Sequence, residues 1–124
     1  MDTREVVDTY YRLANAGDWD RWCDLFTANL VMDEQLAGRI EGRETLRGMM
    51  QGFPGMYAKF QNQPRHVVVD GHEAAVISHI SAVTPSGEPV EAEVVNYFRL
   101  DGELISYMAN FHDTAPFRAV LSDT

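Results

Sequence analysis

The sequence contains a single cysteine, Cys23, so no disulfide can form within the chain. It has no apolar run near the ~20 residues that a bilayer-spanning helix requires. The segment Met1 to Glu5 is neither basic nor apolar, and we therefore expect no secretory signal. Glycine-rich phosphate loops and nucleophile elbows are also missing. These absences favour a cytoplasmic protein without a membrane partner.

Positive charge is scarce. The chain has 10 Lys and Arg against 19 Asp and Glu, a formal net charge of −9. An acidic surface repels phosphate backbones, so we expect no nucleic-acid partner. His66, His72 and His112 lack metal-ligand spacing with carboxylates or with Cys23, and we expect neither a metal nor a cofactor.

The first half of the chain has mainly helical patterns. Apolar residues at helical spacing predict a helix from Thr3 to Asn15, which Gly17 ends. Asp18 caps a short second helix. A third helix begins at Arg43, and Pro54-Gly55 breaks it.

The second half is rich in Val, Ile, Tyr and Phe and predicts strands separated by hairpin turns at Asp70-Gly71, Pro85 to Glu88 and Asp101-Gly102. The predicted strands are Arg65–Asp70, Glu73–Thr84, Pro89–Leu100 and Glu103–His112, after a first strand at Leu30–Leu36 and a turn or short strand at Gly38–Gly42. Helices first and strands afterwards indicate an α+β fold with an antiparallel meander. The 124 residues fit one domain, 1–124, which ends in a short tail, 114–124.

Two polar side chains are predicted to face the apolar side of the sheet. Glu34 shares its parity with Met32 and Leu36, and Asn96 shares its parity with Val94. A buried amide needs hydrogen-bond partners or a ligand, and a carboxylate without water becomes more basic. We therefore expect both residues to serve a pocket, and we expect the pKa of Glu34 to be raised.

The strand Glu73–Thr84 is apolar on both faces, so alternation does not decide which face is inside. The two candidate inward sets are Ile77, His79, Ser81 and Val83, or Val76, Ser78, Ile80 and Ala82.

Four motifs in order carry a resemblance to a known family. They are Tyr10 followed by Gly17-Asp18, Leu25-Phe26-Thr27-Ala28-Asn29, Gly42-Arg43-Glu44, and Tyr97-Phe98-Arg99-Leu100-Asp101-Gly102. With this order and spacing, the chain resembles the nuclear transport factor 2-like superfamily, which includes the ketosteroid isomerases and SnoaL-like polyketide cyclases. The resemblance implies a cone-shaped, curved antiparallel sheet with N-terminal helices on its concave face and one enclosed pocket.

The resemblance also implies a site. Glu34 matches the isomerase general base, Tyr10 matches the tyrosine that donates to the dienolate oxygen, and Asn96 falls where the isomerases have a protonated Asp. His79 matches a pocket position and is a candidate second acid or base; this alignment also places its set of residues inside. The implied pocket lining is Phe26, Met32, Met49, Met50, Ile77, Ser81, Val83, Val94, Tyr107 and Phe111.

Departures from the family limit the choice of activity. Phe26 and Met50 replace tyrosines of some isomerases, and Asn96 cannot share a proton as an acid does, which argues against a steroid isomerase. The Arg and two Asp of limonene epoxide hydrolases are replaced by Val94, Asn96 and Ala109, which excludes that activity.

The leading hypothesis is a cofactor-free isomerase, cyclase or dehydratase that removes a proton α to a carbonyl of a small polyketide- or terpenoid-like metabolite. The alternative is a non-catalytic ligand-binding or dimerisation module, because this fold hosts many functions. In that alternative Glu34 pairs with Arg39 or Arg43.

Other placements also stay open. Asp33, His66 or Asp113 are alternative carriers of the chemistry, and His112-Asp113 is either a dyad at the pocket mouth or a plain strand end. Val95 and Tyr97 among charged neighbours suit the interface of a homodimer.

Overall fold

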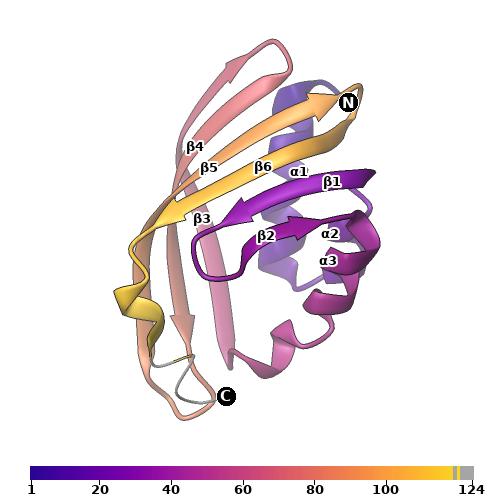
Figure 1. Cartoon of the computed structure of the whole chain (residues 1–124). Coiled ribbons are helices and arrows are strands. Elements are labelled where there is room, and N and C mark those ends of the chain that lie inside the picture. The colour runs from indigo at the N-terminus through magenta and orange to yellow at the C-terminus, as the bar shows by residue number, and fades with distance from the viewer. Residues whose placement is uncertain (119, 121–124) are drawn as a thin grey trace.

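The protein is built on one six-stranded sheet with three helices on its inner side (Figure 1). The computed structural model describes residues 1–118 and residue 120. The helices are α1 (Thr3–Ala16), α2 (Trp19–Cys23) and α3 (Arg43–Met50), with short 3-10 turns at Phe53–Gly55 and Ala115–Phe117. The strands are β1 (Phe26–Glu34), β2 (Gly38–Glu41), β3 (Lys59–Asp70), β4 (Glu73–Val83), β5 (Pro89–Asp101) and β6 (Leu104–His112). The predicted α+β fold is confirmed.

The strand order is β2-β1-β6-β5-β4-β3, and the sheet is mixed rather than wholly antiparallel. The three predicted hairpins are present, and they make β3 to β6 an antiparallel meander. β1, however, lies beside β6 and runs parallel to it. Hairpin signals report only on strands that follow each other in the chain, so they gave no information on this pair.

β3 begins six residues earlier than predicted, at Lys59 instead of Arg65. Pro64 lies inside this strand, although proline cannot donate a hydrogen bond to a neighbouring strand. In the structure, the register between β3 and β4 shifts between Pro64 and His66, and the strand continues through this irregularity. The segment Met56 to Phe60 connects the first 3-10 turn to β3 and supplies the first residues of that strand.

The helix boundaries follow from their caps. The Asp2 side chain accepts a hydrogen bond from the Glu5 N–H, and the Glu5 side chain accepts one from the Asp2 N–H, a reciprocal capping box. α1 ends at Gly17, whose φ of 72° is accessible to glycine at little cost. Asp18 caps α2 as predicted, by accepting from the Arg21 N–H. None of the helices in the described part of the chain is long and apolar enough to cross a membrane.

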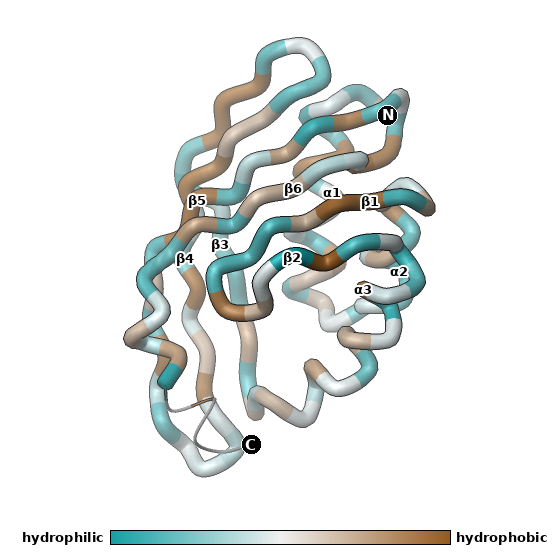
Figure 2. The backbone as a smooth tube through the Cα atoms, viewed as in Figure 1, coloured by the Kyte–Doolittle hydropathy of each residue, from teal (hydrophilic) through white to brown (hydrophobic). Residues whose placement is uncertain are grey.

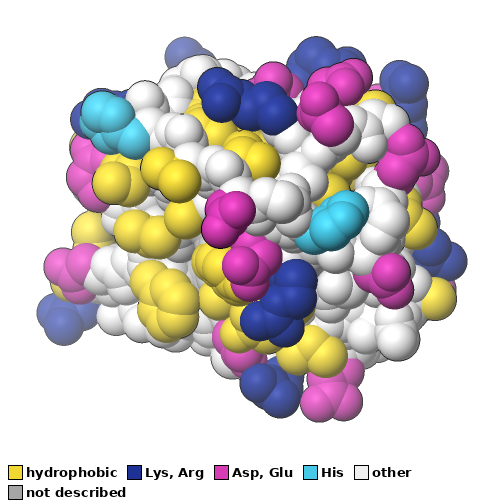
Figure 3. All heavy atoms as spheres, turned by 90° about the horizontal axis from the view of Figure 1, so that it is seen from above, with side chains coloured by type: hydrophobic (Ala, Val, Ile, Leu, Met, Phe, Trp, Pro, Cys, Tyr) yellow, Lys and Arg dark blue, Asp and Glu magenta, His cyan; other side chains and the backbone are white. Residues whose placement is uncertain are grey.

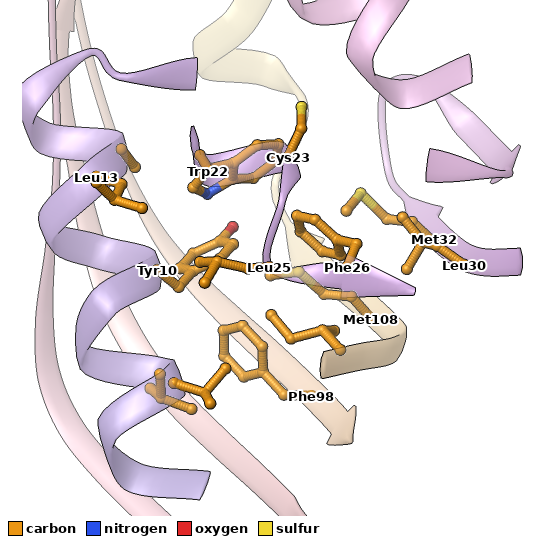
Figure 4. Close-up of a cluster of buried hydrophobic side chains, with 14 of the residues drawn as sticks. Tyr10, Leu13, Trp22, Cys23, Leu25, Phe26, Leu30, Met32, Phe98 and Met108 are labelled. Carbon is orange, nitrogen blue, oxygen red and sulfur yellow. The ribbon is translucent and has the colours of Figure 1, made fainter. Parts of the chain in front are cut away.

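An aromatic core joins the helices to the inner face of the sheet (Figure 4). The Tyr10 ring on α1 lies edge-on to Phe98 on β5, with ring centroids 5.0 Å apart, and Trp22 on α2 packs against Phe26 on β1 at 4.9 Å. Phe26 and Phe98 are fully buried. Burying rings of this size contributes about 2–3 kcal/mol each, which fixes the helices over the concave face.

The C-terminal segment also packs on the sheet. Phe117 is 3% exposed and joins a second buried cluster with Ile80, Val90 and Val94. Within the predicted tail 114–124, positions 119 and 121–124 lie outside the described residues.

Hydropathy alternates along the strands (Figure 2). On β4, where both faces are apolar, the burial of the side chains corrects one prediction. Val76, Ser78, Ile80 and Ala82 are buried, while Ile77, His79, Ser81 and Val83 lie on the outer face of the sheet. The set taken as inward is therefore wrong. The physical reason is the register: His79 is paired with Glu93 and Ser81 with Glu91, so they share the outer face with these carboxylates.

An apolar row crosses the outer face of the sheet. Ile77, Val95 and Phe111 are paired side by side on β4, β5 and β6, and they are 45%, 40% and 53% exposed. Figure 3 views the molecule from above. Hydrophobic side chains lie mainly on the left and in the centre of this view, and charged side chains surround them. Soluble monomers rarely expose contiguous apolar patches of this kind.

We expect this row to pair with a second copy of the chain. A Val95→Glu variant puts a charge in the middle of the row and is expected to shift the protein from dimer to monomer in sedimentation velocity. The circular dichroism spectrum is expected to stay unchanged because Val95 is partly solvent-exposed. A wild-type protein that sediments as a monomer at micromolar concentration contradicts this expectation.

Candidate functional site

A cavity of about 270 Å³ lies between the helices and the concave face of the sheet. Its wall is mainly apolar and aromatic, and the rings that line it are Tyr10, Trp19, Trp22, Phe53, Tyr57, Phe60 and Phe117. Among the described residues, its only charged or readily ionised lining groups besides tyrosine are Glu34 and His112. The size and lining of the cavity suit a small hydrophobic molecule, and its wall carries one acid–base pair.

Glu34 is the last residue of β1, and the backbone of the following turn holds its side chain. Oε2 accepts hydrogen bonds from the N–H groups of Leu36 at 2.7 Å and Ala37 at 2.8 Å. Oε1 lies 2.6 Å from Nε2 of His112, the last residue of β6. The side chain of Glu34 is 19% exposed and that of His112 is 4% exposed, so the pair is largely shielded from water.

The backbone fixes which ring nitrogen of His112 carries a proton. Nδ1 lies 2.9 Å from the carbonyl oxygen of Asp113, and a carbonyl only accepts, so Nδ1 donates. The second proton then lies between Nε2 and the Glu34 carboxylate. The hydrogen bond that Nε2 donates to the Glu34 carboxylate raises the pKa of His112 above 6.5, against the opposing effect of burial. The raised pKa favours an imidazolium paired with a carboxylate.

The direction of the Glu34 pKa shift corrects a prediction. Burial alone raises the pKa of Glu34, but the hydrogen bonds from His112 and from two backbone N–H groups outweigh it, and the pKa lies below 4.5. The prediction of a raised pKa was wrong because it considered only the apolar neighbours. Arg39 bonds to Asp33 instead, and Arg43 bonds to Glu44, so the ion pair proposed between Glu34 and either arginine is also absent.

A buried amide network lies beside this pair. Asn96 Oδ1 accepts from the Tyr11 hydroxyl at 2.7 Å and from the Ser78 hydroxyl at 3.1 Å. Its Nδ2 donates to Asn110 Oδ1 at 2.7 Å. The oxygen of Asn96 and one of its two N–H groups are thus engaged, whereas the NH₂ group of Asn110 has no hydrogen-bond partner among the described residues. Since Asn110 is paired with Glu34 across β1 and β6, it offers a donor on the strand next to the carboxylate.

Tyr10 supplies a second donor. Its ring lies in the aromatic core and its side chain lines the cavity, but its hydroxyl has no hydrogen-bond partner in the described part of the chain. Burial, with a smaller contribution from Glu34, raises the pKa of Tyr10, so it stays protonated and can donate. Burial likewise raises the pKa of Tyr57 to about 12, with Glu34 again contributing.

The geometry can be compared with known proteins. A model of the SnoaL-like domain matches residues 7–108, most of the chain. This chain belongs to the SnoaL-like domain family. The resemblance to the nuclear transport factor 2-like superfamily is thereby confirmed.

Relatives of this SnoaL-like domain are similar over most of its length. An uncharacterised PhzA/B-like protein of Pseudomonas aeruginosa is 30% identical over 115 residues, which cover 86% of this chain and 82% of that protein. An NTF2-like protein of unknown function from Burkholderia pseudomallei has the same fold, with a TM-score of 0.88, 13% identity and 98% of each chain covered. The epoxide hydrolase/cyclase-like enzyme SalBIII, which is described for its role in forming a pyran ring of salinomycin, has a TM-score of 0.80, 25% identity and 92% of each chain covered.

Several residues predicted for the site of this SnoaL-like domain line the cavity. They are Tyr10, Met32, Glu34, Met49, Met50, Val94 and Asn96. Asn96 was expected to donate a hydrogen bond to a ligand. One N–H of its NH₂ group instead donates to Asn110.

The other predicted site residues lie elsewhere. Phe26 is in the closed core, and Ile77, His79, Ser81, Val83, Tyr107 and Phe111 are on the outer face of the sheet. His79 bonds to Glu91 and Glu93, each at 2.9 Å, and these carboxylates raise its pKa far from the cavity. Tyr107 donates to Asp33 at 2.6 Å, also on the outer side. These residues cannot contact a ligand in this cavity, and their placement in the pocket was wrong.

Sequence reasoning did not predict the partner of Glu34. His112 was given either as part of a dyad with Asp113 at the pocket mouth or as a plain strand end, and Asn110 was not singled out. Counting from the Asp101-Gly102 turn pairs Asn96 with Ala109 and Val94 with Phe111, because Asp101 lies opposite Leu104. In the structure the register shifts by one residue between Arg99 and Leu100, and this shift puts Asn110 and His112 opposite Asn96 and Val94. The contact of Glu34 with His112 depends on the parallel pairing of β1 with β6, for which the sequence had no local signal.

Proposed function

We propose that this SnoaL-like domain is a cofactor-free acid–base catalyst that removes and returns a proton next to the carbonyl of a small hydrophobic molecule. The observation that carries the proposal is the ion pair of Glu34 and His112 on the wall of an aromatic cavity. Isomerases, cyclases and dehydratases share this first half-reaction. The choice among them depends on where the resulting enolate reacts.

Glu34 is the base in this scheme. Its lowered pKa keeps it ionised at neutral pH, so it is ready to accept a proton from the carbon α to the carbonyl. The lowered pKa also weakens it as a base. The nearby imidazolium of His112 offsets this loss because it stabilises negative charge that develops on the substrate in a site with little water.

The enolate oxygen requires donors that are not already engaged. The NH₂ group of Asn110, beside Glu34, and the hydroxyl of Tyr10 fit this role. Donors of this kind contribute roughly 10²–10³ in rate each. The proton on Glu34 then returns to another carbon, which is isomerisation. Alternatively, the enolate carbon attacks a second carbonyl and closes a ring, and the alkoxide that forms takes the proton from Glu34.

The similarity to SalBIII supports the cyclase branch, because that protein is described with ring formation and is 25% identical to this chain. Ring closure within one small molecule also suits a closed aromatic cavity, which holds a flexible chain in a folded conformation. A polyketide- or terpenoid-like substrate has the required apolar body and carbonyl group.

The half-reaction can be tested without the natural substrate. We expect the protein to catalyse exchange of the α-protons of 1-tetralone in D₂O, followed by loss of the α-proton signal in the NMR spectrum. The control is the same buffer with acetate and imidazole at the concentration of the protein. Tight binding of the ketone with exchange no faster than in the control contradicts catalysis and favours a ligand-binding module.

A further inference from the structure

Tyr57 lines the cavity, yet the reaction proposed above gives it no role. It lies between the first 3-10 turn and β3, it is half-buried, and it shares the cavity wall with Glu34. Its hydroxyl has no hydrogen-bond partner among the described residues. A neutral phenol offers one donor, so this hydroxyl is available to an acceptor atom of a molecule in the cavity.

The surrounding backbone and rings hold Tyr57 in place. The N–H of Met56 donates to the Phe53 carbonyl at 3.0 Å, and the N–H of Ala58 donates to the backbone carbonyl at the end of β4 at 2.7 Å. The Tyr57 ring centroid lies 5.0 Å from that of Phe53 and 5.3 Å from that of Phe60. A side chain that is already held in this way loses little freedom when it contacts a ligand.

Tyr57 lies at the end of the cavity where His112 holds Glu34. It packs against the second buried cluster, which contains Val94 and Phe117. Val94 is paired with His112 across β5 and β6, and the Phe117 ring lies 4.8 Å from the His112 ring. Burial, with a further contribution from the charge of Glu34, raises the pKa of Tyr57, although no hydrogen bond joins the two side chains. The hydroxyl therefore lies near the carboxylate but not against it, which leaves room for a substrate group between them.

The two tyrosine hydroxyls near Glu34 reach the cavity from different walls. Tyr10 on α1 belongs to the first core cluster with Phe98, whereas Tyr57 packs on the second cluster. Figure 1 shows the segment between the first 3-10 turn and β3 at the end of the molecule opposite to the N-terminus. In the proposed reaction, one carbonyl engages Tyr10 and Asn110, so Tyr57 requires a second acceptor. A carboxylate is disfavoured as this acceptor, because no Lys or Arg among the described residues lines the cavity.

We propose that Tyr57 donates a hydrogen bond to a second carbonyl of the substrate, and that the substrate is a dicarbonyl compound that closes a ring by aldol addition. The inference rests on the proposed function, because Glu34 generates the enolate. The enolate carbon attacks the second carbonyl, so a carbon–carbon bond forms and the carbon–oxygen π bond breaks. Tyr57 stabilises the negative charge on that oxygen, which then takes the proton that Glu34 removed. The product is an isomer of the substrate, and no other reactant is required.

The test uses 2-(3-oxobutyl)cyclohexanone, a diketone whose methyl group forms the enolate and whose ring carbonyl is the electrophile. We expect wild type to convert it to the bicyclic hydroxy ketone faster than the buffer control with acetate and imidazole, as followed by NMR. A Tyr57→Phe variant is expected to cyclise it about a hundredfold more slowly, as after removal of one oxyanion donor. The variant is expected to exchange the α-protons of 1-tetralone within about twofold of wild type, because this ketone has no second carbonyl.

A binding measurement tests the same contact without turnover. The diketone is compared with 4-(2-methylidenecyclohexyl)butan-2-one, in which a methylene group replaces the ring oxygen, by isothermal titration calorimetry on the Glu34→Gln variant. We expect the diketone to bind about tenfold more tightly, and this preference to fall to about twofold or less when Tyr57→Phe is added. Tyr97→Phe is the matched control, because its hydroxyl donates to Glu73 on the outer face of the sheet. It is expected to keep both the preference and the cyclisation rate.

The role of Tyr57 is overturned by equal affinity for the two ligands, or by a preference or cyclisation rate that persists in a Tyr57→Phe variant shown to be folded by circular dichroism. An equal loss of exchange and cyclisation also overturns it, because Tyr57 then acts on the base. Exchange by wild type without cyclisation of the diketone overturns the aldol step.

The same measurements separate this inference from the proposed function. If wild type exchanges no α-protons but the Tyr57-dependent preference is present, the proposed reaction fails and the contact with the second carbonyl stands. If exchange depends on Glu34 but Tyr57→Phe changes neither the preference nor the cyclisation, the proposed reaction stands and the inference fails.

Discussion

A Glu34→Gln variant is expected to exchange the α-protons of 1-tetralone about a thousandfold more slowly than wild type, within the range attributed to a general base. The amide keeps the shape of the side chain and can still accept hydrogen bonds from the two backbone N–H groups of the following turn. It cannot accept the proton from carbon. The comparison therefore removes the base with little change in packing, and circular dichroism and ligand binding check that the fold and cavity persist.

Asp33→Asn provides the matched control. Asp33 precedes Glu34 on β1, but its carboxylate lies on the outer side, where it bonds to Arg39 and Tyr107. The hydrogen bond from Arg39, with that from Tyr107, lowers the pKa of Asp33 to about 2. We expect this variant to keep exchange near the wild-type rate. A Glu34→Gln rate within a fewfold of wild type, or an equal loss in Asp33→Asn, contradicts the assignment of the base.

A His112→Gln variant is expected to lose about a hundredfold in exchange rate near neutral pH, because the cation next to the developing charge is removed. The variant is also expected to shift the acid limb of the pH–rate profile to higher pH. In wild type the hydrogen bond from His112 holds the pKa of Glu34 below 4.5, and without it the effect of burial is less opposed. An acid limb that stays in place means that His112 does not set the pKa of Glu34.

The same pair makes stability depend on pH in a definite window. The pKa of Glu34 is lowered in the folded state, so its contribution is present above about 4.5 and is lost as pH falls through the folded value. The pKa of His112 is raised, so its contribution is present below about 6.5 and is lost as pH rises through the folded value. We expect the difference in unfolding free energy between wild type and His112→Gln, measured by urea titration, to be greatest between these pH values. A difference that is constant over the whole range contradicts the ion pair.

The architecture could largely be predicted from the sequence because it depends on local signals. The capping residues Asp2 and Asp18, the end of α1 at Gly17 and three hairpin turns each act within a few residues of chain. Parity placed Glu34 and Asn96 on the inner face of the sheet, and both line the cavity.

The site was predicted less well because it depends on contacts between distant segments. His79 was predicted to be functional because the resemblance placed it in the pocket, yet the register of β4 with β5 places it beside two carboxylates on the outer face. The register follows from the pairing of Thr84 with Glu88, which makes the turn one residue shorter than the predicted Pro85 to Glu88 segment. Counting across the predicted turn would have placed His79 opposite Val94 instead of Glu93. The partner of Glu34 could not be derived from local signals either, because β1 and β6 are joined by no hairpin.

The wrong prediction for the pKa of Glu34 has a similar origin. Desolvation by apolar neighbours can be inferred from sequence parity, but hydrogen bonds to a carboxylate depend on the local path of the backbone. Here the turn after β1 directs two N–H groups at Glu34, and β6 brings His112 to it. Together these contacts reverse the direction of the shift.

The most direct test of the account is an NMR titration of the wild-type protein that follows the ¹⁵N signals of the His112 ring and the side-chain ¹³C carboxyl signal of Glu34. The account predicts that at neutral pH both ring nitrogens of His112 carry protons and that Glu34 is ionised, with His112 titrating above 6.5 and Glu34 below 4.5. A neutral imidazole at neutral pH, together with a Glu34 that titrates above its ordinary value, would contradict the ion pair on which the proposed chemistry depends.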